Sequence, residues 1–185
     1  MIYKLIMKIL GWKVDKNLPE EFKRCVLIAA PHTSNWDLLY CLLSFKVLKI
    51  NYKFTIKKQW FRFPFNLIIK PLGGLPIDTK KKDKKINTVE LMAEFFKKNK
   101  DFTMAITPEG TRSLRKEWKS GFYEVAKMAN VPICLGYVDF KTKTAGVGGV
   151  IFPKDKMKED MKKIMDFYKT KTPKFPEMFS VDLRY

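Results

Sequence analysis

Short apolar segments typical of β-strands alternate along this chain with segments typical of helices. The run CVLIAA at residues 25–30 is continuously apolar, as expected of a strand covered on both faces. Further strands are predicted at residues 52–56, 75–78, 102–107, 131–138 and 147–152. Helices are predicted from about Trp36 or Asp37 onward and over residues 83–98, 122–130 and 155–168. This alternation predicts an α/β fold, a single domain whose mixed sheet has helices on both faces.

The size and composition of the chain fit one globular domain. Its 185 residues are enough for one compact domain and too few for two. Apolar residues make up 46% and charged residues 30%, which excludes a disordered chain. No apolar run approaches the roughly 18 to 20 residues that span a bilayer, so we expect a protein that is soluble or peripheral to a membrane.

Histidine and cysteine are scarce. The single histidine and the cysteines Cys25, Cys41 and Cys134 match no zinc or redox spacing, so no metal site is expected. An odd and sparse set of cysteines also favours a reducing compartment over a secreted disulfide scaffold.

The large positive net charge of the chain limits the classes of molecule that it is expected to bind. Thirty-seven Lys and Arg against 19 Asp and Glu give a formal net charge of +18. Such a surface attracts nucleic acid, anionic lipid or phosphorylated substrates. A nucleic-acid-binding domain is one alternative, but the lysines are spread along the whole chain without an RNP-like, helix-turn-helix or zinc motif. Nucleic acid is therefore not an expected partner.

Residues 1–13 form a segment of their own. On a helical wheel of about 100° per residue, Lys4, Lys8 and Gly11 fall in one narrow polar wedge. The remaining arc is apolar and holds Ile2, Tyr3, Leu5, Ile6, Met7, Ile9, Leu10 and Trp12. Two interpretations stay open: a terminal helix docked on the domain, or an amphipathic helix lying in a membrane interface. We predict a membrane-associating helix at 1–13 and a main domain at 14–185.

A second cluster of aromatic residues lies within residues 59–74. Here aromatic residues alternate with the basic Arg62 in the sequence; they are Trp60, Phe61, Phe63 and Phe65. This mixture is typical of a second contact with a lipid surface.

The only histidine, His32, follows the predicted strand at residues 25–30. Sites in α/β sheets form where strands end. Asp37 can meet the imidazole only if His32 lies in the loop and Asp37 in the first turn of the helix. Ser34 and Asn35 are suitable capping residues for that start. Asp37 would then fix the imidazole tautomer and leave a nitrogen as base, although an ordinary polar helix start is the alternative.

Two further turns carry chemistry. PEGTRS at residues 108–113 follows the predicted strand at 102–107. Its Gly110 lets the backbone approach a ligand, and Arg112 offers a fork for phosphate. GGLPID at residues 73–78 is by itself a tight turn into a strand.

In this order and spacing, the motifs resemble those of the glycerolipid acyltransferase family, whose best-known members are 1-acylglycerol-3-phosphate O-acyltransferases. HTSNWD at 32–37 resembles the family's H-x-x-x-x-D motif, GGLPID at 73–78 its second block, PEGTRS at 108–113 its third, and VPI at 131–133 its fourth. The resemblance covers roughly residues 25–138 and implies that the main domain at 14–185 is an acyltransferase domain.

The resemblance implies a role for each motif residue. His32 would be the general base that takes the proton from the acceptor hydroxyl, and Asp37 would orient it. Backbone donors near Gly110 would stabilise the developing oxyanion. The acceptor would be bound by Glu109, Gly110, Thr111, Arg112 and Lys80. Members commonly carry an arginine after the second block, where this chain has Thr79 followed by lysines, so Lys80 would assist Arg112 in holding a phosphate.

The resemblance also implies the partners. These are an acyl thioester, either acyl-CoA or acyl carrier protein, a lysophospholipid acceptor such as 1-acylglycerol-3-phosphate, and an anionic membrane surface. No cofactor is expected besides the thioester co-substrate, and the expected location is peripheral, at the cytoplasmic face of the membrane. A membrane adaptor without catalysis is a further alternative, against which the intact His32 and Asp37 argue.

Overall fold

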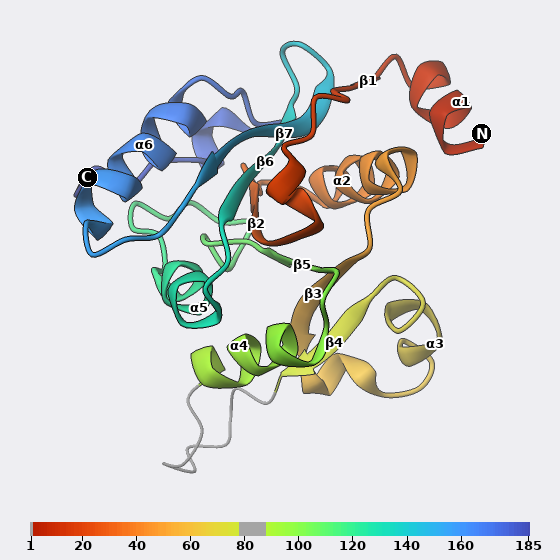
Figure 1. The fold of residues 1–185 in the computed structure, drawn as a ribbon. Helices are drawn as coiled ribbons and strands as arrows, with labels where there is room; N and C mark the ends of the chain where they lie inside the picture. The colour runs from red at the N-terminus through yellow and green to blue at the C-terminus, as the bar shows by residue number, and fades with distance from the viewer. Residues whose placement is uncertain (1, 78–87) are drawn as a thin grey trace.

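The computed structural model describes residues 2–77 and 88–185, and these residues form a mixed sheet of seven strands (Figure 1). In sheet order the strands are β1 (Lys13–Val14), β7 (Thr144–Ile151), β6 (Ile133–Asp139), β2 (Arg24–Ala30), β5 (Phe102–Ile106), β3 (Tyr52–Lys57) and β4 (Gly74–Ile77). Only β6 and β7 pair antiparallel, and every other pair is parallel. The predicted mixed α/β sheet is confirmed.

Helices cover both faces of this sheet. The α-helices are α1 (Ile2–Ile9), α2 (Asn35–Leu48), α3 (Asn66–Ile69), α4 (Thr88–Lys98), α5 (Gly121–Ala129) and α6 (Met157–Lys169). Short 3₁₀ turns lie at η1 (Glu20–Lys23), η2 (Lys58–Phe61) and η3 (Pro176–Met178). In Figure 1, α4, α5 and α6 lie on one side of the central strands and α2 on the other.

The central strand β2 explains why its sequence is continuously apolar. Successive side chains of a strand point to opposite faces. Val26 and Ile28 join the core formed with α4, α5 and α6, whereas Cys25 and Leu27 pack on the side of α2. Because helices cover both faces, all four side chains are fully buried, and the prediction of a strand at residues 25–30 is confirmed.

Some predicted boundaries were wrong for identifiable reasons. The strand predicted over 131–138 begins at Ile133, because the N–H of Val131 donates to Ala126 and closes helix α5. The strand predicted from residue 147 begins at Thr144, because glycines in this strand interrupt the apolar pattern by which a strand is predicted. One of these, Gly148, has no room for a Cβ, which would lie 2.4 Å from the ring of Phe167 in α6.

Other differences concern short elements and the edges of the described residues. The two-residue strand β1 is too short to show any periodicity and was not predicted. The helix predicted over 83–98 is present as α4 from Thr88, while residues 83–87 lie outside the described residues. The strand predicted at 75–78 is present as β4, and Asp78 also lies outside them.

One side of the N-terminal segment packs on the domain, and the other side is exposed to solvent. Met7 and Trp12 are buried, and the Trp12 ring stacks on Tyr40 of α2 with centroids 3.9 Å apart. The apolar side chains of Ile2, Leu5 and Ile9 are, by contrast, 57–75% exposed. Among the described residues, no helix is long and apolar enough to cross a membrane.

The parallel pairing of β2 with β5 positions the site. These strands are direct neighbours, with Ile28 opposite Ile106. Their carboxyl ends therefore lie side by side, and the chain leaves each of them into a polar loop. Residues 31–34 follow β2 and residues 107–120 follow β5. The two motifs, far apart in sequence, meet at one edge of the sheet.

Candidate active site

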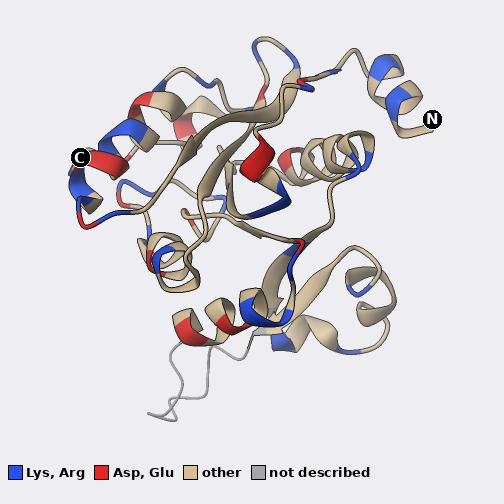
Figure 2. Cartoon of the chain, viewed as in Figure 1, with Lys and Arg blue, Asp and Glu red and all other residues tan. Residues whose placement is uncertain are grey.

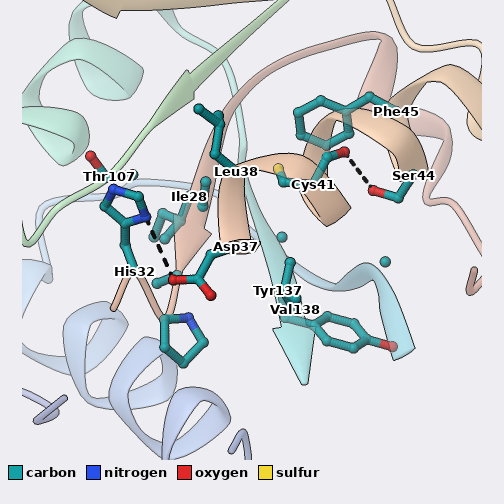
Figure 3. A pocket seen from close by; sticks show the side chains of 15 residues that line it. Ile28, His32, Asp37, Leu38, Cys41, Ser44, Phe45, Thr107, Tyr137 and Val138 are labelled. Atoms are coloured by element: carbon teal, nitrogen blue, oxygen red, sulfur yellow. Dashed lines mark hydrogen bonds and ion pairs between the residues drawn. The ribbon is translucent and has the colours of Figure 1, made fainter. Parts of the chain in front are cut away.

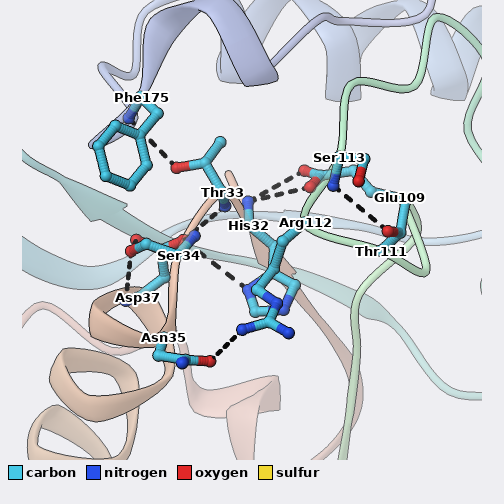
Figure 4. A network of polar contacts seen from close by, with 10 residues as sticks. All are labelled: His32, Thr33, Ser34, Asn35, Asp37, Glu109, Thr111, Arg112, Ser113 and Phe175. Carbon is cyan, nitrogen blue, oxygen red and sulfur yellow. Dashed lines mark hydrogen bonds and ion pairs between the residues drawn. The ribbon is translucent and has the colours of Figure 1, made fainter.

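Asp37 organises the loop that carries His32 (Figure 4). Ser34 is the N-cap of α2, and Asp37 lies in its first turn, as predicted; the two form a capping box. The Asp37 carboxylate accepts the N–H groups of Thr33 and Ser34 at 2.5 and 2.6 Å and the Ser34 hydroxyl at 2.7 Å. It thus holds the backbone on which His32 sits.

The imidazole of His32 faces the same carboxylate. Its Nδ1 lies 3.8 Å from Asp37 Oδ2, which is longer than a hydrogen bond. Burial lowers the pKa of His32 below its usual value, and Arg112 adds to this effect while Asp37 opposes it. The imidazole is therefore neutral at pH 7, which is the state that a general base requires.

Glu109 ties the second loop to the first. Its carboxyl oxygens accept the backbone N–H of His32 at 3.0 and 3.2 Å (Figure 4). The residue is 5% exposed, and burial raises the pKa of its carboxyl to about 8. The resemblance assigns Glu109 to the acceptor, and in this structure its contact is with the histidine loop.

The remaining residues of PEGTRS surround this contact. Gly110 has φ +66°, a left-handed conformation that favours glycine, and its N–H donates to Thr107 at 3.1 Å. That N–H is therefore already engaged within the loop, and the expectation that backbone donors near Gly110 stabilise an oxyanion stays a prediction. Thr111 accepts the N–H of Ser113 at 3.3 Å.

Arg112 lies at the exposed rim of the site. Its Nη1 donates to the side-chain oxygen of Asn35, which brings the guanidinium beside the start of α2 (Figure 4). Lys80, the other residue assigned to a phosphate, lies outside the described residues.

An apolar cavity opens beside His32. Its volume is about 1160 Å³ including the open mouth, and it is bounded by α2, β3 and β5. Its lining is mostly apolar and includes Leu38, Leu42, Phe45, Phe54, Ile56, Met92 and Ile106. His32, Thr107, Gly110 and Lys119 also line it. The cavity is suited to a hydrocarbon chain whose reactive end lies at the histidine.

A smaller cavity of about 450 Å³ adjoins the first (Figure 3). The two share His32, Leu38 and Cys41, and the smaller one extends toward Tyr137 and Val138 of β6. Burial raises the pKa of the Cys41 thiol to about 12, so this cysteine is not a nucleophile at neutral pH.

The chain matches the Acyltransferase family over residues 13–135. It belongs to that family. The matched region contains both loops of the site as well as GGLPID and VPI, and no curated protein matches the chain. This acyltransferase therefore has the general activity of acyl transfer. The loops at residues 31–34 and 107–120, which carry two of its motifs, meet at the carboxyl ends of β2 and β5.

Sequence reasoning missed one residue of this acyltransferase site, Lys119. Its side chain lines the cavity next to Gly110 and His32. In the sequence it is one lysine of the charged run RKEWK, which carries no signal that separates it from a solvated surface.

The C-terminal part of the acyltransferase, beyond the matched region, supports both loops. The N–H of Phe175 donates to the Thr33 hydroxyl at 3.3 Å (Figure 4). Asp182, which is fully buried, accepts the N–H of Trp118 at 2.8 Å. Among the described residues, no group of three or more His, Cys, Asp or Glu side chains could hold a metal ion.

Proposed function

We propose that this acyltransferase moves a fatty acyl group from an acyl thioester to a hydroxyl group of a lysophospholipid, with 1-acylglycerol-3-phosphate as the preferred acceptor. The observation that carries the proposal is the position of His32. A half-buried, neutral imidazole, held in place through Asp37, lies at the mouth of an apolar cavity.

The proposed reaction needs no covalent enzyme intermediate. Nδ1 of His32 faces Asp37, which leaves Nε2 to take the proton of the acceptor hydroxyl. The hydroxyl oxygen attacks the thioester carbon, an ester bond forms and the carbon–sulfur bond breaks. The leaving thiolate takes the proton back from His32, so the imidazole returns to its starting state.

The substrates are assigned from the surroundings of His32. The acyl chain of the thioester, from acyl-CoA or acyl carrier protein, lies in the apolar cavity. The phosphate of the acceptor lies at the rim, where Arg112 supplies a bidentate fork. Its present partner, the Asn35 side chain, is neutral and can be displaced by a phosphate with little cost in charge pairing.

We also propose that the enzyme works at an anionic membrane surface, at the cytoplasmic face. Two exposed apolar groups support this: the outer side of α1 and the side chains of Trp60, Phe63, Phe65, Leu67 and Ile68, which are 45–79% exposed. Figure 1 shows α1 and α3 protruding on the same side of the molecule. Basic residues lie on or next to both groups, as Figure 2 shows, and match an anionic lipid surface.

The test is acyl transfer with purified protein. Labelled acyl-CoA and acyl carrier protein thioesters are each offered with a panel of lysophospholipids and amino-acid lipids. Transfer to 1-acylglycerol-3-phosphate above all other acceptors is the expected result. Transfer to a different lysophospholipid would correct the acceptor, and absence of transfer to every acceptor would favour the adaptor alternative.

A further inference from the structure

Lys119 presents a positive charge at the mouth of the apolar cavity. Its stem lies across Gly110: a Cβ atom at that position would be 3.0 Å from Lys119 Nζ and 3.3 Å from Cε. The side chain can take this path because residue 110 has no Cβ. Lys119 and His32 line the same cavity.

The backbone at Lys119 is fixed from two sides. The N–H of Lys119 donates to the carbonyl of Pro108 at 3.0 Å, which closes the loop between PEGTRS and α5. The preceding residue, Trp118, is buried and donates its N–H to the carboxylate of Asp182. The lysine therefore extends from an anchored position, as a preorganised electrostatic group requires.

The ammonium of Lys119 is not engaged by any other described residue. Within the part of the chain that the structure describes, its side chain makes no ion pair and no hydrogen bond. The other cation near His32, Arg112, already donates to Asn35. The backbone N–H of Gly110, which also lines the cavity, donates to the carbonyl of Thr107.

We propose that Lys119 is a catalytic residue that stabilises the oxyanion formed during acyl transfer; this inference rests on the proposed function. As the hydroxyl oxygen bonds to the thioester carbon, the carbonyl π electrons move onto the carbonyl oxygen. The Lys119 ammonium pairs with that negative charge and keeps its own proton. When the carbonyl forms again, the carbon–sulfur bond breaks, and the thiolate receives the proton held by His32.

The test compares Lys119→Met with Lys119→Arg, using Lys116→Met as the matched control. Lys116 is exposed in the same loop and does not line the cavity. Loss of one oxyanion donor lowers kcat by about 10²- to 10³-fold. We expect this loss for Lys119→Met, with KM for both substrates changed by less than about threefold. Lys119→Arg keeps the charge and should recover part of kcat, and Lys116→Met should match wild type.

The acceptor panel separates this role from phosphate binding. An oxyanion contact predicts the same fall in kcat for 1-acylglycerol-3-phosphate and for a neutral acceptor. A rise in KM confined to the phosphate-bearing acceptor would overturn the proposal and make Lys119 a phosphate contact. Unchanged kinetics in Lys119→Met would overturn it as well. Failure of the proposed function is distinct, because wild-type protein would then transfer no acyl group to any acceptor.

Discussion

The carboxyl group of Glu109 accepts the backbone N–H of His32, with nitrogen–oxygen distances of 3.0 and 3.2 Å. This contact joins the loop after β5 to the loop after β2. Glu109 holds the backbone N–H of the proposed base, and Asp37 accepts the N–H groups of Thr33 and Ser34, so two carboxyl groups hold the loop that carries the imidazole.

The raised pKa of Glu109 makes stability depend on pH. Its carboxyl has a pKa of about 8 in the folded chain against 4.5 ordinarily, so the folded state holds the proton more tightly. Stability from this group is full below pH 4.5 and is lost as the pH rises toward 8. Glu109→Gln keeps an oxygen acceptor and cannot ionise. Urea unfolding measures how much the free energy of unfolding falls between pH 5 and pH 8. This fall should be smaller for Glu109→Gln than for wild type, and equal falls would contradict a raised pKa at Glu109.

Removal of His32 tests the base directly. His32→Ala should lower kcat by about 10²- to 10⁴-fold, since no second histidine exists to replace the base. The melting temperature should stay nearly unchanged. Because the pKa of His32 is lowered, the wild-type rate should fall only on the acid side of pH 6.5. Near-wild-type turnover in the purified variant would exclude His32 as the base.

Asp37 differs from His32 in its effect on folding. Its carboxylate caps α2 and accepts three hydrogen bonds, so Asp37→Asn should cost about 1 to 2 kcal/mol of stability besides activity. Chemical denaturation and kcat, measured on the same preparation, check both effects. A variant with full stability but no activity would show that orientation of the imidazole is its only role.

Arg112→Lys should raise KM for a phosphate-bearing acceptor, because a lysine keeps the charge and loses the bidentate fork. A neutral acceptor should show little change. Steady-state kinetics with 1-acylglycerol-3-phosphate and with a neutral acceptor make the comparison. Equal changes for both would mean that Arg112 acts through its hydrogen bond to Asn35 instead.

Membrane binding can be tested without disturbing the core. Deletion of residues 1–13 would also remove Met7 and Trp12, which are buried. Replacement of Ile2, Leu5 and Ile9 by serine changes only exposed side chains. A smaller fraction of this triple variant than of wild type should sediment with anionic vesicles, and the difference should grow at high salt. Its melting temperature should be unchanged. Undiminished sedimentation would leave the docked helix as the better interpretation.

Features that depend on neighbouring residues could be predicted from the chain order alone. The apolar run at 25–30 predicts a covered strand, and the capping residues Ser34 and Asn35 predict a helix start that has Asp37 in its first turn. Both follow from hydrogen bonds and side-chain periods within one element, which the chain order specifies. The positions of His32 and Asp37 relative to the helix were predictable for the same reason, and their catalytic roles stay predictions.

Contacts between different helices, strands and loops could not be predicted in this way. The contact from Glu109 to His32 joins residues 77 positions apart and depends on the pairing of β2 with β5. The path of Lys119 over Gly110 depends on a left-handed turn and on the buried anchor at Asp182. Composition and periodicity do not predict such contacts, because the contacts arise from strand register and from the packing of loops. These features are properties of the assembled sheet.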